Sequence, residues 1–218
     1  MMQIVQVFAR APVPGACKTR LIPAIGAEGA AQLQRNLTRH TLATAAAWRA
    51  SVPGARIELW CAPDQGDDFF AQCAREFPLQ LHDQPGGDLG ARMWLALMHA
   101  LRRGERAVLV GTDCPWLDPR ALGALHEALA GHDSALIPAD DGGYVAVGLS
   151  RALPELFAGV AWGSPQVMAQ TRARARLARA SLAELGSLAD VDVPADLQRL
   201  RADARLCHLL PAAAKATA

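Results

Sequence analysis

A group of cationic and hydroxyl side chains surrounds a loop near the start of the chain. Arg10 precedes the loop, and Lys18, Thr19 and Arg20 end it. Lysine and arginine are the side chains that most often hold phosphate groups in proteins. The grouping is therefore typical of a phosphate-binding loop, although a solvated loop with basic residues would look the same in the sequence.

This loop follows neither of the common phosphate-binding motifs. A Walker A loop needs a glycine directly before the lysine, where this chain has Cys17, and Gly15 is the only glycine of the loop. The three-glycine dinucleotide motif is missing for the same reason. Neither P-loop nor Rossmann binding is therefore supported. We expect Gly15 and its neighbours to bind a nucleotide phosphate in another way.

Asp113 is the first candidate for chemistry among the acidic residues. It follows an apolar run at 107–110 that has the pattern of a central parallel strand. An aspartate at the carboxyl end of such a strand, facing the basic loop, can hold Mg²⁺ together with phosphate oxygens. A local turn with Cys114 and Pro115 explains an aspartate at this position as well.

Two more acidic pairs occur later in the chain. Asp190 and Asp192 could complete a two-carboxylate metal site, although Asp192 could equally serve the N-terminus of a helix that begins at Pro194. Asp140 and Asp141 lie in a Gly-rich turn, which is a hairpin turn by default. Asp141 is nevertheless our candidate for a catalytic group that meets the hydroxyls of an acceptor or acts as a general base.

A second loop is rich in glycine. Gly86, Gly87 and Gly90, with Asp88 between them, precede a predicted helix. Such glycines let the backbone approach a flat base or a pyrophosphate, with the N-terminus of the helix behind it. A tight turn explains the same residues nearly as well.

The elements that must position these residues alternate between strand and helix over the first 138 residues. Strands are predicted at 3–9, 56–61, 79–82, 107–110, 134–138 and 144–147. Helices are predicted at 27–50, 118–129 and 164–174. Further helices begin at about 64 and at 194, and another opens within 84–93 and reaches Leu101. Residues 177–188 form a weak strand or helix. This order predicts an α/β fold with a mostly parallel sheet and an antiparallel excursion around the turn at 140–143. The basic loop, the glycine-rich loop and 111–115 each follow a strand, so they should converge at one edge of the sheet.

The composition is that of an ordinary globular protein, with 51% hydrophobic and 20% charged residues. We expect a single domain over 1–210 and a frayed tail at 211–218. A net charge of +1 argues against nucleic acid as the main partner.

Five cysteines without a C-x-x-C pair indicate a reducing compartment. We find neither a signal peptide nor an apolar stretch that would span a membrane, and we expect a cytoplasmic protein. The six histidines are never three or four positions apart, so the spacing predicts no zinc site.

Six motifs, in this order, cover nearly the whole chain from Met2 to about Leu200: FARAPVPGACKTRL, GGDLGARM, GTDCPWL, PADDGGYVAVGL, WGS and DVDVPADL. Together they resemble a family of uncharacterised GT-A-like nucleotide-diphospho-sugar transferases, which are relatives of the molybdenum-cofactor and phospholactate guanylyltransferases. The resemblance implies a three-layer α/β/α fold and the use of a nucleotide with a divalent metal.

The resemblance also implies roles for single residues. Arg10, Lys18 and Arg20 would contact the phosphates, and Gly87 to Gly90 would form the loop beside the base. Asp113 would bind the metal, with Asp192 as the candidate second ligand.

We therefore expect a Mg²⁺- or Mn²⁺-dependent transferase that moves a glycosyl or nucleotidyl group from a nucleotide-sugar or a nucleoside triphosphate to a small acceptor. Lys18, Asp113 and Asp141 are the catalytic candidates. A guanylyl- or cytidylyltransferase that releases pyrophosphate and a nucleotide-binding module without turnover are the alternatives. A homodimer would follow if the tryptophans formed an apolar surface patch, but core positions explain them equally well.

Overall fold

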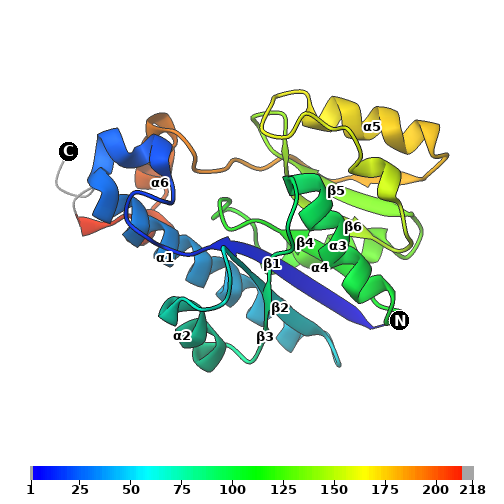
Figure 1. The fold of residues 1–218 in the computed structure, drawn as a ribbon, viewed down its shortest axis with the longest axis horizontal. Helices are drawn as coiled ribbons and strands as arrows, with labels where there is room; N and C mark the ends of the chain where they lie inside the picture. Colours follow the sequence, from blue (N-terminus) through cyan, green and yellow to red (C-terminus); the bar gives the residue numbers. More distant parts are fainter. Residues whose placement is uncertain (1, 213–218) are drawn as a thin grey trace.

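The computed structural model describes residues 2–212, and its centre is one seven-stranded sheet in the order β3-β2-β1-β4-β6-β5-β7 (Figure 1). The strands are β1 (Gln3–Arg10), β2 (Arg56–Ala62), β3 (Gln80–Asp83), β4 (Arg106–Val110), β5 (Ser134–Pro138), β6 (Tyr144–Leu149) and β7 (Leu182–Glu184). Of the strands in this described range, only β6 runs antiparallel to its neighbours, which are β4 and β5. The predicted mostly parallel sheet with an antiparallel excursion is confirmed.

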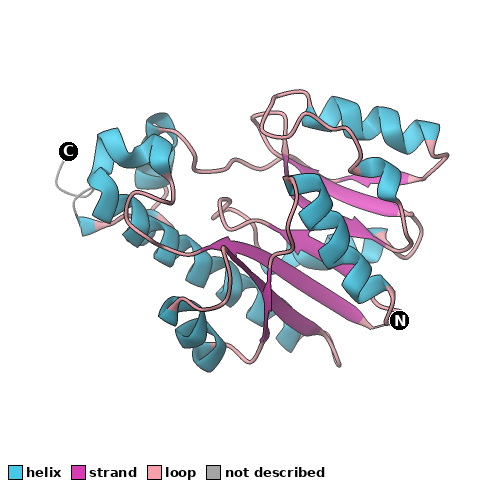
Figure 2. Cartoon of the chain, in the orientation of Figure 1, coloured by secondary structure: helices cyan, strands magenta, loops and turns pink. Residues whose placement is uncertain are grey.

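Helices cover both faces of the sheet (Figure 2). They are α1 (Ile22–Ala50), α2 (Asp68–Glu76), α3 (Leu89–Leu101), α4 (Pro119–Ala128), α5 (Val167–Leu177) and α6 (Pro194–Ala202), with short 3₁₀ turns at Thr19–Leu21, Pro154–Leu156 and Cys207–Leu209. One hydrophobic core joins the sheet to α1, α2 and α4, and a second joins its other face to α3 and α5. This is the predicted three-layer α/β/α fold.

The central strands are apolar on both sides because both of their faces are covered. In β1, Val5 and Val7 belong to the core beneath α1, whereas Ile4 and Phe8 belong to the core beneath α3. Strands buried in this way appear in a sequence as continuous apolar runs rather than as an alternating pattern. Because β1, β3 and β4 run parallel, their carboxyl ends lie at the same edge of the sheet, from which the three predicted loops emerge.

Several predicted element bounds differ from the structure. The first crossover helix begins at Ile22 rather than at Ala27, and it is interrupted at Gly26, whose backbone is not helical. The helix expected from 164 begins at Val167, because a turn precedes it. In the predicted tail, Pro211 is buried, and residues 213–218 lie outside the described residues.

The C-terminal segment returns to the first half of α1. Leu197 and Leu200 of α6 share a third hydrophobic core with Leu33 and Leu37 of α1. This packing places the segment before α6, which contains Asp192, beside the loop after β1. Within the described residues, no helix combines the length and the apolar character needed to cross a membrane.

Gly142 fixes the turn that joins β5 to β6. Its φ is +92°, and a Cβ at this position would lie 2.3 Å from the carbonyl oxygen of Pro165. We expect Gly142→Ala to lower the free energy of unfolding by about 1–3 kcal/mol, because the clash is with backbone that cannot move aside. Urea unfolding measures the change. Gly186→Ala is the control, since a Cβ there meets open space, and an equal loss in both variants would contradict the prediction.

Candidate active site

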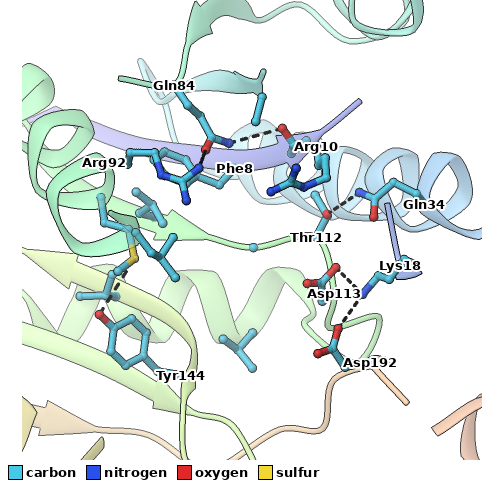
Figure 3. Close-up of a pocket in the computed structure, with 18 of the residues that line it drawn as sticks. Phe8, Arg10, Lys18, Gln34, Gln84, Arg92, Thr112, Asp113, Tyr144 and Asp192 are labelled. Atoms are coloured by element: carbon cyan, nitrogen blue, oxygen red, sulfur yellow. Dashed lines mark hydrogen bonds and ion pairs between the residues drawn. The ribbon is translucent and has the colours of Figure 1, made fainter. Parts of the chain in front are cut away.

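The three loops converge on a cavity of about 490 Å³ at the carboxyl edge of the sheet (Figure 3). Its lining includes Arg10, Lys18, Thr19 and Arg20 from the first loop, Gln84 and Leu89 from the second, and Gly111, Thr112 and Asp113 from the third. The convergence that the parallel strands predicted is therefore confirmed. Asp192 completes this end of the cavity from the C-terminal segment.

Lys18 lies between the two carboxylates that the sequence singled out as metal ligands. Its ammonium nitrogen is 2.6 Å from Asp113 Oδ1 and 3.4 Å from Asp192 Oδ1, and it donates to the carbonyl oxygen of Val191 at 2.6 Å. The side chain is only 3% exposed, so burial opposes its charge, but Asp113 and then Asp192 outweigh burial and raise the pKa of the lysine. All three ammonium donors are thus engaged within the protein.

Backbone contacts hold Asp192 in place. Val191 donates its N–H to the carbonyl oxygen of Asp113 at 2.8 Å, which ties the C-terminal segment to the loop after β4. Asp196 caps the N-terminus of α6, because its Oδ2 accepts hydrogen bonds from the backbone N–H groups of Asp192 and Val193. The Asp192 side chain therefore does not cap the helix, and instead it faces Lys18 and Arg20, with Arg20 Nη1 3.0 Å from Oδ2.

Further negative charge lies next to these groups. Burial, together with the charges of Asp141 and Asp192, raises the pKa of Asp190 to about 6. Asp113 and Asp192 are half-exposed, with 48% and 41% of their side chains accessible, and oxygen ligands of this kind suit Mg²⁺ or Mn²⁺. The two half-exposed carboxylates and the nearby Asp190 fit a divalent cation, and the Lys18 ammonium between them competes with that cation for the same oxygens.

Two guanidinium groups in the cavity remain available for an anion. Within residues 2–212, Arg10 makes no side-chain hydrogen bond or ion pair, and Arg92 of α3 pairs with no carboxylate. Arg92 Nη1 donates to Gln84 Oε1 at 3.2 Å, but its Nε is buried without a partner. Gln84 is fixed in turn by donating to the carbonyl oxygens of Trp60 and Ala9. The cavity therefore offers unpaired positive charge beside its acidic end.

The other end of the cavity is apolar. Phe8, Met93, Leu109 and Val147 line it together with Tyr144, the only tyrosine of the chain. The Tyr144 hydroxyl has a weak partner, the sulfur of Met93 at 4.0 Å (Figure 3), and burial raises the pKa of the phenol. A ligand with an apolar body and one polar group would satisfy this end.

Two residues of the glycine-rich loop, Asp88 and Gly90, have structural roles at the start of α3. The Asp88 carboxylate accepts from the N–H of Ala91 at 2.8 Å and so caps α3. A Cβ on Gly90 would lie 2.5 Å from the indole nitrogen of Trp162, so only glycine permits this packing. Gly15, Gly86, Gly87, Asp88 and Gly90 do not line the cavity, and their roles in nucleotide binding remain predictions.

Asp141 also lies outside the lining of the cavity. Its Oδ1 accepts from the N–H of Gly143 at 2.8 Å, as in a hairpin turn. Its charge nevertheless reaches Asp190, whose pKa it helps to raise. Its catalytic role remains a prediction.

The sequence reasoning missed Gln84, Arg92 and Tyr144. Arg92 lies inside the GGDLGARM motif and Tyr144 inside PADDGGYVAVGL, so both were within the segments that carried the resemblance. Nothing in the spacing indicated that their side chains face the cavity.

A family profile described as "Uncharacterized protein conserved in bacteria (DUF2064)" matches residues 41–164, which is more than half of the chain. The chain belongs to this family. No curated protein sequence matches it significantly.

Solved structures extend the similarity to the whole chain. A structure from Desulfovibrio desulfuricans G20, provisionally described as a nucleotide-diphospho-sugar transferase, is 27% identical, with a TM-score of 0.81 over 98% of this chain and 92% of that one. The match confirms the fold and the resemblance that the six motifs indicated.

Two more distant structures share the fold. The CMP:2-keto-3-deoxy-manno-octonic acid synthetase complexed with CTP is 14% identical, with a TM-score of 0.53 over 92% of this chain and 97% of that one. Rv0371C from Mycobacterium tuberculosis H37Rv, complexed with manganese, is 19% identical, with a TM-score of 0.50 over 91% and 97%.

Proposed function

We propose that this chain is a divalent-metal-dependent transferase that binds a nucleotide in the cavity at the carboxyl edge of the sheet. The donor is a nucleotide-sugar or a nucleoside triphosphate, and a glycosyl or nucleotidyl group passes to a small acceptor. The observation that carries the proposal is the convergence of Arg10, Lys18, Asp113 and Asp192 on one cavity. The likeness to a nucleotide-diphospho-sugar transferase and to a synthetase complexed with CTP supports it.

Asp113 and Asp192 would hold Mg²⁺ or Mn²⁺, and the manganese complex of a protein with this fold supports the use of a divalent cation. A bound divalent cation would neutralise phosphate charge. Arg10, Arg20 and Arg92 would orient the phosphates, because all three residues line the cavity. Catalysis would then come from positioning and from charge neutralisation, as in other phosphate-centred transfers. Asp141 would act on the hydroxyl of the acceptor.

Glycosyl transfer and nucleotidyl transfer are the two candidate reactions, and the synthetase complexed with CTP favours nucleotidyl transfer. The two reactions differ in their products. Nucleotidyl transfer from a triphosphate releases pyrophosphate, whereas glycosyl transfer releases a nucleoside mono- or diphosphate. A pyrophosphate assay with each triphosphate and a panel of phosphorylated acceptors therefore separates them.

The first test of the proposal is thermal stability with nucleoside di- and triphosphates and nucleotide-sugars, each with and without Mg²⁺. A ligand at about 100 times its Kd adds about 2.7 kcal/mol, which raises the Tm of a chain of this size by several degrees. We expect a Mg²⁺-dependent increase with one nucleotide family. Absence of any increase across the panel would contradict nucleotide binding, and binding without product would favour a module that has no turnover.

A further inference from the structure

A second group of metal-ligating side chains lies away from the cavity, between the sheet and α3. Glu58 of β2, His82 of β3 and His99 of α3 each offer one ligand atom, and these atoms lie within 4.8 Å of one another. The spacing of the histidines along the sequence predicted no zinc site. That rule considers only histidines that are close in the sequence, whereas the fold brings together residues from three separate elements.

The two imidazoles face one carboxylate oxygen without bonding to it. His82 Nε2 is 3.7 Å and His99 Nε2 is 3.9 Å from Glu58 Oε1, which is beyond hydrogen-bond distance. His82 Nε2 is also buried without a hydrogen-bond partner, which costs about 1–3 kcal/mol for a buried polar group. A metal ion among the three groups would supply the missing partner.

Trp60 fixes the orientation of all three groups. His82 stacks on its ring at 4.7 Å, and His99 meets it edge-on at 5.6 Å. The indole N–H donates to Glu58 Oε2 at 3.1 Å, and Gln6 donates to the same oxygen at 2.9 Å. Glu58 Oε1 therefore remains directed at the histidines, in the way that outer contacts orient the ligands of a metal.

Burial lowers the pKa of His82 in spite of the nearby Glu58 charge. A neutral imidazole is the form that binds a metal. His99 is half-exposed and borders a surface groove of about 500 Å³, which leaves one side of the group open to water.

Arg103 is the group that opposes a cation here, because its Nη2 is 2.6 Å from Glu58 Oε1. The same guanidinium also contacts Glu105 Oε2 through Nε at 3.1 Å and through Nη2 at 2.9 Å. Arg103 therefore keeps Glu105 as a carboxylate partner when Glu58 Oε1 binds a metal. Its charge would weaken metal binding without preventing it.

We propose that Glu58, His82 and His99 form a Zn²⁺ site with water as the fourth ligand, separate from the carboxylate site of the cavity. Two histidines and one carboxylate with an open position are a characteristic zinc ligand set. Bound Zn²⁺ joins α3 to β2 and β3. Because α3 carries Arg92, the metal also steadies one wall of the cavity.

The test is a calorimetric titration of the chelator-treated protein with Zn²⁺, with Co²⁺ as a spectroscopic probe. We expect about one Zn²⁺ per chain and the visible bands of tetrahedral Co²⁺. Loss of an outer contact to a metal ligand costs about 10- to 100-fold in affinity, so His99→Ala, which removes a ligand, should weaken binding at least as much. The His99 side chain is 42% exposed, and its loss should leave the fold intact by circular dichroism.

Three further variants complete the test. His82→Ala should weaken Zn²⁺ binding like His99→Ala. His132→Ala, which removes an exposed histidine outside the group, should bind like the unchanged protein. Asp113→Asn should also keep the binding, because that residue belongs to the cavity. Absence of Zn²⁺ binding, unchanged binding in His99→Ala, or loss of binding in Asp113→Asn would overturn the proposal.

Discussion

Replacing Lys18 by alanine is expected to reduce nucleotide affinity by about 10- to 150-fold, because it removes charge-assisted contacts with Asp113 and Asp192, of a kind that contributes about 1.5–3 kcal/mol, and leaves both carboxylates without their neutralising charge. The loss has two physical sources. The ammonium supplies positive charge to the cavity, and it neutralises Asp113 and Asp192, from which it lies 2.6 and 3.4 Å away. Without it, both carboxylates would repel the phosphates. Isothermal calorimetry with the nucleotide found in the thermal panel measures the change.

A second variant separates the charge of Lys18 from its backbone conformation. Lys18 has φ 46° and ψ 41°, the left-handed region that glycine adopts without strain. Lys18→Gly should therefore be more stable than Lys18→Ala by about 1 kcal/mol, while both lose nucleotide affinity alike. Arg176→Ala, which removes an exposed cation from α5, should change neither property. Nucleotide affinity that is unchanged in both Lys18 variants would contradict the role of this residue.

The architecture of the site followed from local sequence because βα units are local structures. A strand that ends at a proline-rich loop, and another that ends at Asp113, must open at the same edge when both lie parallel in one sheet. Lys18 and Asp113 could therefore be brought together before the structure was known. The position of Asp192 does not follow from this rule, because the hydrophobic core between α6 and α1, which are far apart in the sequence, places it.

The residues that were missed depend on packing between distant elements. Arg92 faces the cavity because Asp88 caps α3 and because Gly90 packs closely against Trp162, which together set the start and rotation of the helix. Neither contact can be inferred from spacing. The Glu58, His82 and His99 group shows the same limit, since a rule for histidines one helical turn apart cannot detect a group of side chains from two strands and a helix.

Asp113→Asn is expected to lower the Mg²⁺ affinity of the nucleotide complex, and so to weaken the Mg²⁺ dependence of nucleotide binding, while the fold is retained. Asparagine has nearly the same shape and keeps one oxygen, and Lys18 keeps its contacts with Asp192 and the Val191 carbonyl oxygen. Mg²⁺ is usually held by one or two protein carboxylates together with substrate phosphates. Removal of one carboxylate should therefore lower the Mg²⁺ affinity of the nucleotide complex by at least about tenfold.

The matched control is Asp118→Asn, on the same segment. Asp118 caps α4 by accepting from the N–H of Ala121 at 2.8 Å, and asparagine caps helices about as well as aspartate. Asp118→Asn should therefore bind the nucleotide with the Mg²⁺ dependence of the unchanged protein. The measurement is a nucleotide titration of each variant with and without Mg²⁺, with thermal unfolding as the check on the fold. If Mg²⁺ strengthens nucleotide binding in a folded Asp113→Asn variant as much as in the unchanged protein, Asp113 does not hold the metal.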